Sequence, residues 1–285
     1  MEQNIQDIRL KLESSKIHYG KNPLSKLNNS KFPLVSVCTV VKNNKNGLVK
    51  AIKSLINQDY KNIEYIVIDG ASSDGTTDVI KKYEKYIDIW VSEKDEGTPE
   101  ACNKGITLSN GTYFVWLASD DWYESDFISE AVASLKEKDL DFVVGQSIMY
   151  RKETGEKIFA TTKPNKSFKD IINQAGSFNY GQIVNHKRCF EKIGILDDSF
   201  KFVNDLDWLI RLYRSIKPKA EYNHKMKINR TAEGLASNYF KQSRLEILAV
   251  LKKHNLPIRR MIFSEMKSII IVKLGKIKRI LTEWK

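Results

Sequence analysis

Short apolar runs alternate with amphipathic segments along the first half of the chain. The strand-like runs are 35–41, 63–68, 87–91 and 113–117, and apolar residues recur at helical spacing in 48–56, in 76–86 and from Pro99 onward. Polar loops that contain glycine or asparagine separate most of these segments. Alternating strands and helices with short connections predict βαβ units, and therefore an α/β fold in which helices cover both faces of a mostly parallel sheet.

The pattern becomes less regular after Trp122. It predicts a helix near 126–138 and a strand at 142–144, and the sequence from there to about residue 240 shows no clear period. We interpret this part as a second half that packs on the same sheet. The predicted organisation is an N-terminal extension (1–32), one main α/β domain (33–240) and a helical C-terminal tail (241–285).

Polar side chains follow several of the predicted strands at the point where each strand ends. Asn43, Asp69 and Asp121 all lie just beyond the carboxyl end of a strand. In open parallel sheets, ligands bind outside the carboxyl ends of the strands. This edge of the sheet is therefore the predicted functional site.

The segment Ser119-Asp120-Asp121 follows a strongly apolar strand. Two adjacent carboxylates repel each other, and their partial burial is costly without a nearby cation. A divalent metal ion bound together with a diphosphate would supply that positive charge. The alternative is that the two acids begin the next helix and stabilise its N-terminus.

Three further segments permit a functional and a structural interpretation. Residues 69–76 either bind an anion through exposed backbone amides or form a capped turn. Asn103 and Lys104 either face a phosphate or sugar or are ordinary solvated helix residues. Asp205 and Asp207 open an amphipathic helix, where they either complement the helix dipole or place one carboxylate in a cleft as a general base.

Taken together, these motifs resemble the family 2 inverting glycosyltransferases of GT-A fold, in particular the bacterial enzymes of surface-polysaccharide synthesis. The resemblance rests on Lys42-Asn43 after the first strand, Ile68–Thr76, Asn103–Gly105, Leu117–Asp121 and Asn204–Arg211. It covers roughly residues 34–237. It implies a GT-A catalytic domain with a nucleotide-binding sheet edge.

The resemblance also implies how a nucleoside diphosphate sugar, most simply a UDP-sugar, would bind. Asp69 would lie by the base and ribose, and Val40 and Lys42 would line the same pocket. Asn103 and Lys104 would face the phosphate or the sugar.

The chemistry implied by the resemblance is transfer of the sugar, with inversion, to a hydroxyl group of a glycan or lipid-linked acceptor. Asp120 would contact the ribose and the metal ion, and Asp121 would ligate Mn²⁺ or Mg²⁺ on the diphosphate. Asp205 would be the general base that deprotonates the acceptor hydroxyl.

The sequence departs from the family pattern at several positions. Gly70 stands where many relatives have a second acid, and Asn204 stands where a glutamate is common. A histidine that ligates metal in some relatives has no clear match in 229–235, and His224 is the nearest candidate. No Gln/Arg-x-x-Arg-Trp sequence occurs, which argues against a processive polymer synthase.

The positive charge is concentrated at the C-terminal end. The formal net charge is +12, and residues 241–285 contain twelve lysine or arginine residues against three acidic ones. Apolar residues recur there at near-helical spacing, which predicts a basic amphipathic helix that binds an anionic membrane surface. The alternative is that this face packs on the catalytic domain or on a second subunit.

Composition indicates the cellular compartment and argues against two classes of protein, disulfide-rich scaffolds and proteins that span a membrane. The three cysteines, Cys38, Cys102 and Cys189, are widely spaced, which argues against a disulfide scaffold and favours a reducing compartment. No apolar run approaches the length of a membrane span, so we expect a cytoplasmic protein that is peripheral on the inner face of the membrane. Two alternatives stay open, a nucleotidyltransferase on a related sheet and an RNA-binding module that uses the basic tail, although no nucleic-acid partner is expected.

Overall fold

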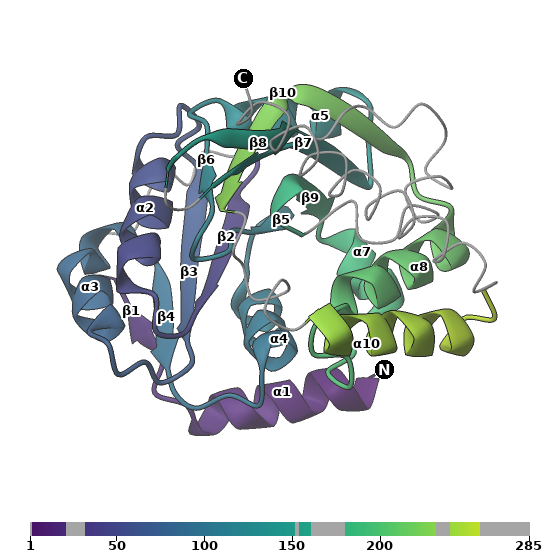
Figure 1. Cartoon of the computed structure of the whole chain (residues 1–285), viewed down its shortest axis with the longest axis horizontal. Helices are drawn as coiled ribbons and strands as arrows, with labels where there is room; N and C mark the ends of the chain where they lie inside the picture. Colours follow the sequence, from purple (N-terminus) through teal and green to yellow (C-terminus); the bar gives the residue numbers. More distant parts are fainter. Residues whose placement is uncertain (1, 21–31, 152–153, 161–179, 232–239, 257–285) are drawn as a thin grey trace, which may run out of the picture.

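The computed structural model describes residues 2–20, 32–151, 154–160, 180–231 and 240–256. Within these residues, a ten-stranded sheet forms the centre of the molecule (Figure 1). The strand order is β1-β4-β3-β2-β5-β9-β7-β10-β6, and β8 pairs with the outer part of β7. The strands are β1 (His18–Tyr19), β2 (Val35–Val41), β3 (Ile63–Asp69), β4 (Ile89–Ser92), β5 (Tyr113–Trp116), β6 (Trp122–Tyr123), β7 (Phe142–Tyr150), β8 (Lys157–Ala160), β9 (Ile183–His186) and β10 (Ala220–Thr231).

The first half of the sheet is parallel, as the alternation of strands and helices predicts. Strands β4, β3, β2 and β5 pair in parallel, and β9 pairs antiparallel with both β5 and β7. The helices are α1 (Glu2–Ser14), α2 (Lys45–Ile56), α3 (Thr76–Lys82), α4 (Thr98–Leu108), α5 (Phe127–Glu137), α7 (Arg188–Ile193), α8 (Asn204–Ile216) and α10 (Phe240–Lys253). The short 3-10 helices are η2 (Glu84–Tyr86) and η3 (Tyr180–Gln182). The predicted α/β fold is confirmed, but the helix expected over 76–86 ends at Lys82, and η2 replaces its last turn.

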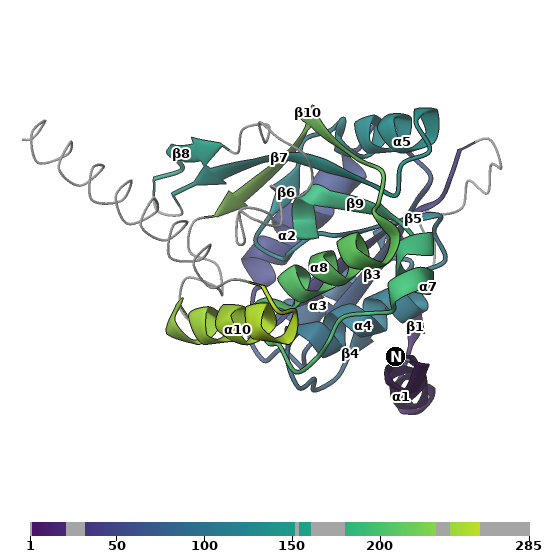
Figure 2. The same ribbon diagram turned by 90° about the vertical axis from the view of Figure 1, so that its right-hand side faces the viewer.

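Helices cover both faces of the sheet. One hydrophobic core joins the sheet to α2, α3 and α5, and a second core on the opposite face joins it to α1, α4, α7 and α8. The two views in Figures 1 and 2 show these helical layers on either side of the strands. Because both faces are buried, the accessible part of the sheet is the edge where the parallel strands end.

The N-terminal segment is attached to the main sheet. Ile8 and Leu12 of α1 are buried in the core that includes α4, and β1 adds an antiparallel strand to β4. The His18 ring stacks on Trp90 with 3.8 Å between the ring centroids. These contacts extend the sheet by one short strand beyond β4.

Strand β10 is the main element that the sequence did not predict. Its twelve residues include polar and charged side chains at most positions, and a bulge interrupts its pairing with β7 between Asn223 and Lys227. Met226 and Ile228 are buried in the core, so tertiary pairing rather than an apolar run defines this strand. It carries Arg230 and Thr231 to the edge of the sheet where β5 ends.

Helix α10 packs on α8 through a small apolar cluster that includes Ile210 and Val250. The rest of the predicted basic tail, residues 257–285, lies outside the described residues. Among the helices of the described part, none combines the length and the apolar character needed to cross a bilayer.

Candidate active site

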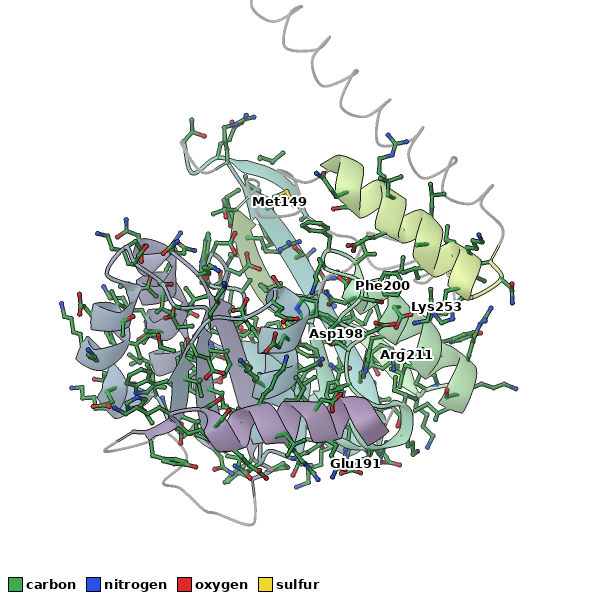
Figure 3. All side chains as sticks on the ribbon, turned by 90° about the horizontal axis from the view of Figure 1, so that it is seen from below. Met149, Glu191, Asp198, Phe200, Arg211 and Lys253 are labelled. Atoms are coloured by element: carbon green, nitrogen blue, oxygen red, sulfur yellow. The ribbon has the colours of Figure 1, made fainter. Side chains whose placement is uncertain are left out.

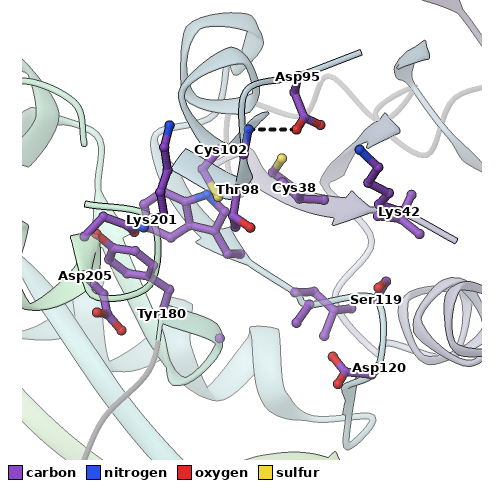
Figure 4. A pocket seen from close by; sticks show the side chains of 18 of the residues that line it. Cys38, Lys42, Asp95, Thr98, Cys102, Ser119, Asp120, Tyr180, Lys201 and Asp205 are labelled. Atoms are coloured by element: carbon purple, nitrogen blue, oxygen red, sulfur yellow. Dashed lines mark hydrogen bonds between the residues drawn. The ribbon is translucent and has the colours of Figure 1, made fainter. Parts of the chain in front are cut away.

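A cavity of about 800 Å³ opens at the carboxyl ends of β2 and β5. Its wall continues through the loop before α4, which includes Gly97, and through the segment 201–205 at the start of α8. Figure 4 shows Asp120 and Asp205 on opposite sides of this cavity. The fold therefore brings together two acids that are far apart in the sequence.

Four of the predicted site residues line the cavity. Val40 and Lys42 lie at the end of β2, Asp120 follows β5, and Asp205 lies in the first turn of α8. Lys42 is on the same side as Asp120 (Figure 4). These residues form one site because the parallel strands β2 and β5 are neighbours in the sheet.

Asp69 lies behind the cavity and is fully buried. Its carboxylate accepts hydrogen bonds from the backbone N–H of Ser72 at 3.1 Å and from the hydroxyls of Ser72 and Ser92 at 2.5 and 2.6 Å. These three bonds fix the turn between β3 and α3 against the end of β4. Asp69 is not among the cavity-lining residues in this conformation.

Asn103 and Lys104 do not line the cavity, so the prediction that they face a phosphate or sugar is wrong. Both are buried, so the alternative that they are solvated helix residues is wrong as well. The Asn103 side chain donates to the backbone carbonyl of Leu196 and accepts from its N–H, at 3.0 and 2.9 Å. Lys104 is 2% exposed and forms ion pairs with Glu93 and Glu100. Their polar atoms are thus already paired within the protein, which gives both side chains a structural role here.

Gly105 allows helix α4 to pack closely on the sheet. A Cβ atom at this position would come within 2.2 Å of the Cys38 sulfur, so the missing side chain lets α4 pack directly on β2. The close packing fixes the second half of α4 against β2, whose end lines the cavity. The segment 103–105 consequently shapes the cavity without lining it.

The two acids after β5 have different environments. Asp120 lines the cavity, whereas Asp121 is 2% exposed and forms an ion pair with Arg230, with 3.3 Å between Oδ2 and Nε. Burial raises the pKa of Asp121 to about 7; the Arg230 guanidinium opposes this shift and the charge of Asp120 adds to it. The residues after Asp121 form strand β6, and α5 begins only at Phe127, so the interpretation of the acids as a helix start is wrong.

Arg230 and Thr231 are site residues that the sequence did not reveal. Thr231 Oγ1 donates to the Asp120 carboxylate at 3.3 Å, and Arg230 pairs with Asp121. Both residues belong to the end of β10, within the segment 229–235 where no metal-binding histidine could be found. His224 lies further back on β10, is exposed and does not line the cavity. The arginine thus supplies positive charge beside the acid pair.

Asp205 and Asp207 also separate into two roles. Asp205 lines the cavity, and burial raises its pKa to about 6, although a hydrogen bond from the backbone N–H of Leu206 acts in the opposite direction. Asp207 is fully buried and contacts Arg211, Lys253 and His254, each at 2.8 Å. Asp205 therefore presents a carboxyl group with a raised pKa to the cavity, while Asp207 links α8 to the end of α10.

The Asp95 side chain occupies the space that a side chain at Gly70 would fill. A Cβ atom on Gly70 would approach Asp95 Oδ2 to 2.5 Å. Asp95 lines the cavity, and its other oxygen accepts from the backbone N–H of Gly97 at 2.9 Å. The acid that the family pattern places directly after Asp69 is absent, yet the fold provides a carboxylate close to that position from the loop after β4.

The sequence matches the family model of glycosyl transferase family 2 over residues 36–200, more than half of the chain. The chain belongs to glycosyl transferase family 2. The matched region contains β2 to α7 and the acid pair 120–121, and it ends just before the segment 201–205 that carries Asp205. The family assignment favours the transferase hypothesis over a nucleotidyltransferase or an RNA-binding module.

Individual glycosyltransferases are similar to this chain at 27–30% sequence identity. The uncharacterised glycosyltransferase RP339 of Rickettsia prowazekii is 29% identical over 192 residues, which cover 64% of this chain and 59% of that protein. WfaP of Escherichia coli, described as a UDP-Glc:alpha-D-GlcNAc-diphosphoundecaprenol beta-1,3-glucosyltransferase, is 27% identical over 190 residues, covering 65% of this chain and 73% of WfaP. The chain spans less than two thirds of several relatives, including 60% of the Rickettsia typhi glycosyltransferase RT0329.

Solved structures confirm the GT-A fold of this family 2 chain. The mannosyltransferase PcManGT of Pyrobaculum calidifontis, in complex with GDP-Man and Mn²⁺, superimposes with a TM-score of 0.61 at 14% identity, covering 92% of this chain and 75% of PcManGT. TarS of S. aureus superimposes with a TM-score of 0.56 at 17% identity, covering 76% of this chain and 65% of the TarS chain. At these identities the likeness concerns the fold.

The acids of this family 2 site fit a divalent cation that is shared with a diphosphate. Within the described ranges, no three side chains of His, Cys, Asp or Glu gather to hold a metal ion. Mg²⁺ in nucleotide sites is bound by one or two carboxylates together with substrate phosphates and water, and Mn²⁺ accepts the same oxygen ligands. Asp120, which faces the cavity and accepts one long hydrogen bond from Thr231, satisfies that requirement.

Glu246 of α10 holds the segment that carries the candidate base. Its carboxylate accepts from the backbone N–H groups of Lys201 at 2.9 Å, Phe202 at 2.8 Å and Val203 at 3.2 Å. Three bonds to successive amides fix the loop immediately before α8, so Glu246 determines where Asp205 enters the cavity. Figure 3 shows α10 beside this loop, with Lys253 near Phe200.

We expect Glu246→Ala to lower kcat by about 10-fold or more. Each hydrogen bond to a charged group stabilises a protein by about 1.5–3 kcal/mol, so the loss of these bonds frees the loop before α8 and displaces Asp205. Glu246→Gln keeps one acceptor oxygen and should give an intermediate rate. Steady-state assays of both variants, with Gln242→Ala on the exposed side of the same helix as the control, measure the effect. A wild-type kcat in Glu246→Ala would contradict the positioning role.

Proposed function

We propose that this chain transfers a sugar from a nucleoside diphosphate sugar, with UDP as the nucleotide, to a hydroxyl group of a glycan or lipid-linked acceptor with inversion at the anomeric carbon. The observation that carries the proposal is the placement of Asp120 and Asp205 on opposite sides of one cavity in a family 2 chain. A carboxylate at the diphosphate and a second carboxylate across the sugar are the two groups that such a displacement requires.

The donor would lie along the carboxyl ends of β2 and β5. Val40 and Lys42 line the part of the cavity next to Asp95, and we assign the base and ribose to this part. Asp69 supports it from behind through the turn of Ser72. The diphosphate is assigned to the side of Asp120, where the parallel strands end.

Asp120 would hold Mn²⁺ or Mg²⁺ together with the diphosphate, and the ion would supply positive charge that stabilises the departing nucleoside diphosphate. Strand β10 supports both acids of this site, because Arg230 pairs with the buried Asp121 and Thr231 donates to Asp120. The ion pair holds Asp121 in place from the β10 side. The sequence analysis named both acids as metal ligands, and we propose Asp120 as the main one because it lines the cavity whereas Asp121 does not.

Asp205 would act as the general base. Its carboxylate would accept the proton of the acceptor hydroxyl while the acceptor oxygen attacks the anomeric carbon from the side opposite the diphosphate. Burial, which raises the pKa of Asp205 to about 6, brings its proton affinity closer to that needed at neutral pH. In-line attack from the opposite face inverts the anomeric configuration.

Relatives support the substrate class. The name of WfaP specifies a UDP-Glc donor and a diphosphoundecaprenol-linked acceptor, and TuaG of Bacillus subtilis is described as a putative teichuronic acid glycosyltransferase. TarS has been solved with UDP-GlcNAc, and PcManGT with Mn²⁺. By analogy we assign this chain to surface-polysaccharide synthesis, as a cytoplasmic protein whose basic tail holds it at the anionic inner face of the membrane near a lipid-linked acceptor.

A thermal-shift screen of nucleoside diphosphates and their sugars, with and without Mn²⁺, tests the donor proposal. A ligand at 100 times its Kd stabilises the folded state by about 2.7 kcal/mol, so a cognate donor should raise the unfolding midpoint by several degrees. We expect UDP-sugars with Mn²⁺ to give the largest rise. Equal midpoints with UDP, GDP, ADP and without ligand would contradict the proposal.

A further inference from the structure

Two aromatic side chains in the cavity carry polar atoms that lack a hydrogen-bond partner within the described structure. These atoms are the indole Nε1 of Trp116 and the phenol oxygen of Tyr180, and both are buried. Trp116, the last residue of β5, is 4% exposed and lines the cavity together with Tyr180, the first residue of η3. Figure 4 shows Tyr180 on the side of the cavity that carries Asp205.

The two rings form a rigid unit. Their centroids are 4.2 Å apart, and Phe190 and Trp208 pack around them. The backbone next to both rings is fixed as well, because the Tyr123 hydroxyl lies 2.9 Å from the carbonyl oxygens of both Trp116 and Gly181. Neither ring can therefore turn freely to find another partner.

Three other buried aromatic donors among the described residues are paired. The indole of Trp208 donates to the carbonyl of Gly194 at 3.0 Å, the hydroxyl of Tyr65 donates to Thr39 at 3.0 Å, and the hydroxyl of Tyr123 is paired as described. A buried polar atom without a partner destabilises the folded state, and most such atoms in proteins are satisfied. Gln182, Asn185, Asn62 and Asn229 also carry buried atoms without a partner among the described residues, but only Trp116 and Tyr180 of this group line the cavity, where a ligand can supply the acceptors.

The positions of Trp116 and Tyr180 in the cavity indicate which part of the substrate would contact them. Trp116 lies four residues before Asp120, and the negative charge of Asp205 is among the causes, after burial, that raise the pKa of Tyr180. The two rings therefore belong to the region between the diphosphate side and the base side of the cavity. The group that must occupy this region during transfer is the sugar ring, whose oxygens can accept from an indole N–H and a phenol O–H.

We propose that Trp116 and Tyr180 form the subsite that binds the transferred sugar of the donor, through hydrogen bonds from Trp116 Nε1 and the Tyr180 hydroxyl to oxygen atoms of the pyranose. This inference rests on the proposed function and extends it to the residues that select the sugar. The aromatic faces add apolar contact, while the two donors discriminate between sugars that differ in the position of an oxygen.

The test compares Tyr180→Phe with Tyr123→Phe, which removes a paired hydroxyl. Since the Tyr180 hydroxyl has no partner among the described residues, Tyr180→Phe should leave the unfolding midpoint unchanged or higher, whereas Tyr123→Phe should lower it. With UDP, UDP-glucose and UDP-N-acetylglucosamine as probes, we expect Tyr180→Phe to keep its affinity for UDP and to lose about 10-fold in affinity for the UDP-sugar that the wild type binds best. Trp116→Phe should show the same selective loss.

The outcomes separate this subsite from the proposed function. If wild-type protein and both variants bind the UDP-sugar equally well and have the same KM for it, the subsite assignment is wrong while the proposed function stands. An increase in the acceptor KM alone, with unchanged donor binding, would also overturn the assignment to the donor sugar. If the wild type binds none of the three probes, the proposed function fails, and the subsite with it.

Discussion

The Asp205→Asn variant should lose about 10²–10⁴-fold in kcat, which is the range that general base catalysis contributes. The asparagine has nearly the same shape but cannot accept the proton of the acceptor hydroxyl. Donor binding should be almost unchanged, since we assign the base, ribose and diphosphate to the side of Lys42 and Asp120. Initial rates with donor and acceptor measure the loss, and thermal shift with the donor measures binding.

The pH dependence of the wild type provides a second measurement of the same residue. The pKa of Asp205 is raised to about 6 by burial, so kcat/KM should rise with pH through about 6 and level off above it as the carboxylate forms. A raised carboxyl pKa means that the folded state favours the protonated form of Asp205. The stability that the protonated carboxyl contributes is therefore lost as the pH rises through about 6. Asp205→Asn should therefore unfold at a temperature equal to or above that of the wild type at pH 8.

A matched control excludes a general effect of losing one acid. Asp198 is a partly buried aspartate outside the cavity lining, and Asp198→Asn should retain the wild-type rate and pH profile. If Asp205→Asn retained more than a third of the wild-type kcat, the base would have to be sought elsewhere in the cavity.

The second large effect is expected for Asp120→Ala, which should lower kcat/KM by about 10³-fold and remove the dependence of donor binding on Mn²⁺. Asp120 is the carboxylate of the acid pair that faces the cavity. Asp121→Asn should have a smaller effect on metal-dependent binding, because Asp121 lies behind and acts through Arg230. Titration of Mn²⁺ into each variant in the presence of UDP, followed by thermal shift, measures the difference.

The exposed Asp78 on α3 serves as the control for this series, and Asp78→Asn should bind UDP and Mn²⁺ as the wild type does. The decisive result is which of the two variants, Asp120→Ala or Asp121→Asn, loses more of the Mn²⁺ dependence of donor binding. A larger loss of Mn²⁺ dependence in Asp121→Asn than in Asp120→Ala would make Asp121, which the sequence analysis also named as a metal ligand, the main ligand instead.

Much of the sheet could be predicted because its parallel strands are apolar on both faces. Strand β2 coincides with the predicted run 35–41, and β3 extends the run 63–68 by only Asp69. The polar strand β10 could not be predicted, since its conformation depends on pairing with β7 and β6 rather than on its own hydrophobic pattern. Arg230, which reaches the acid pair from this strand, was missed for the same reason.

Some residues of the candidate site could also be predicted from the sequence, and others could not. Asp120 and Asp205 were identified because their motifs resemble the family, and both line one cavity, one after a strand end and the other at a helix start. The residue pattern alone left the roles of Asp205 and Asp207 open. Asn103 and Lys104 were misplaced, since whether a polar helix residue faces a ligand or the protein depends on partners such as Leu196 that are far away in the sequence. Glu246 acts at a distance of more than forty residues from its partners, and no local pattern reveals it.

The buried carboxylate of Asp207 has a consequence for where the functional unit ends. Arg211 comes from the same helix, but Lys253 and His254 are contributed by the last turn of α10 and the residue after it. A protein shortened before residue 240 would lose two of these three partners and the Glu246 carboxylate, leaving an interior negative charge poorly compensated. The smallest version able to assemble its catalytic pocket thus extends well past the family-matched region, to about residue 256.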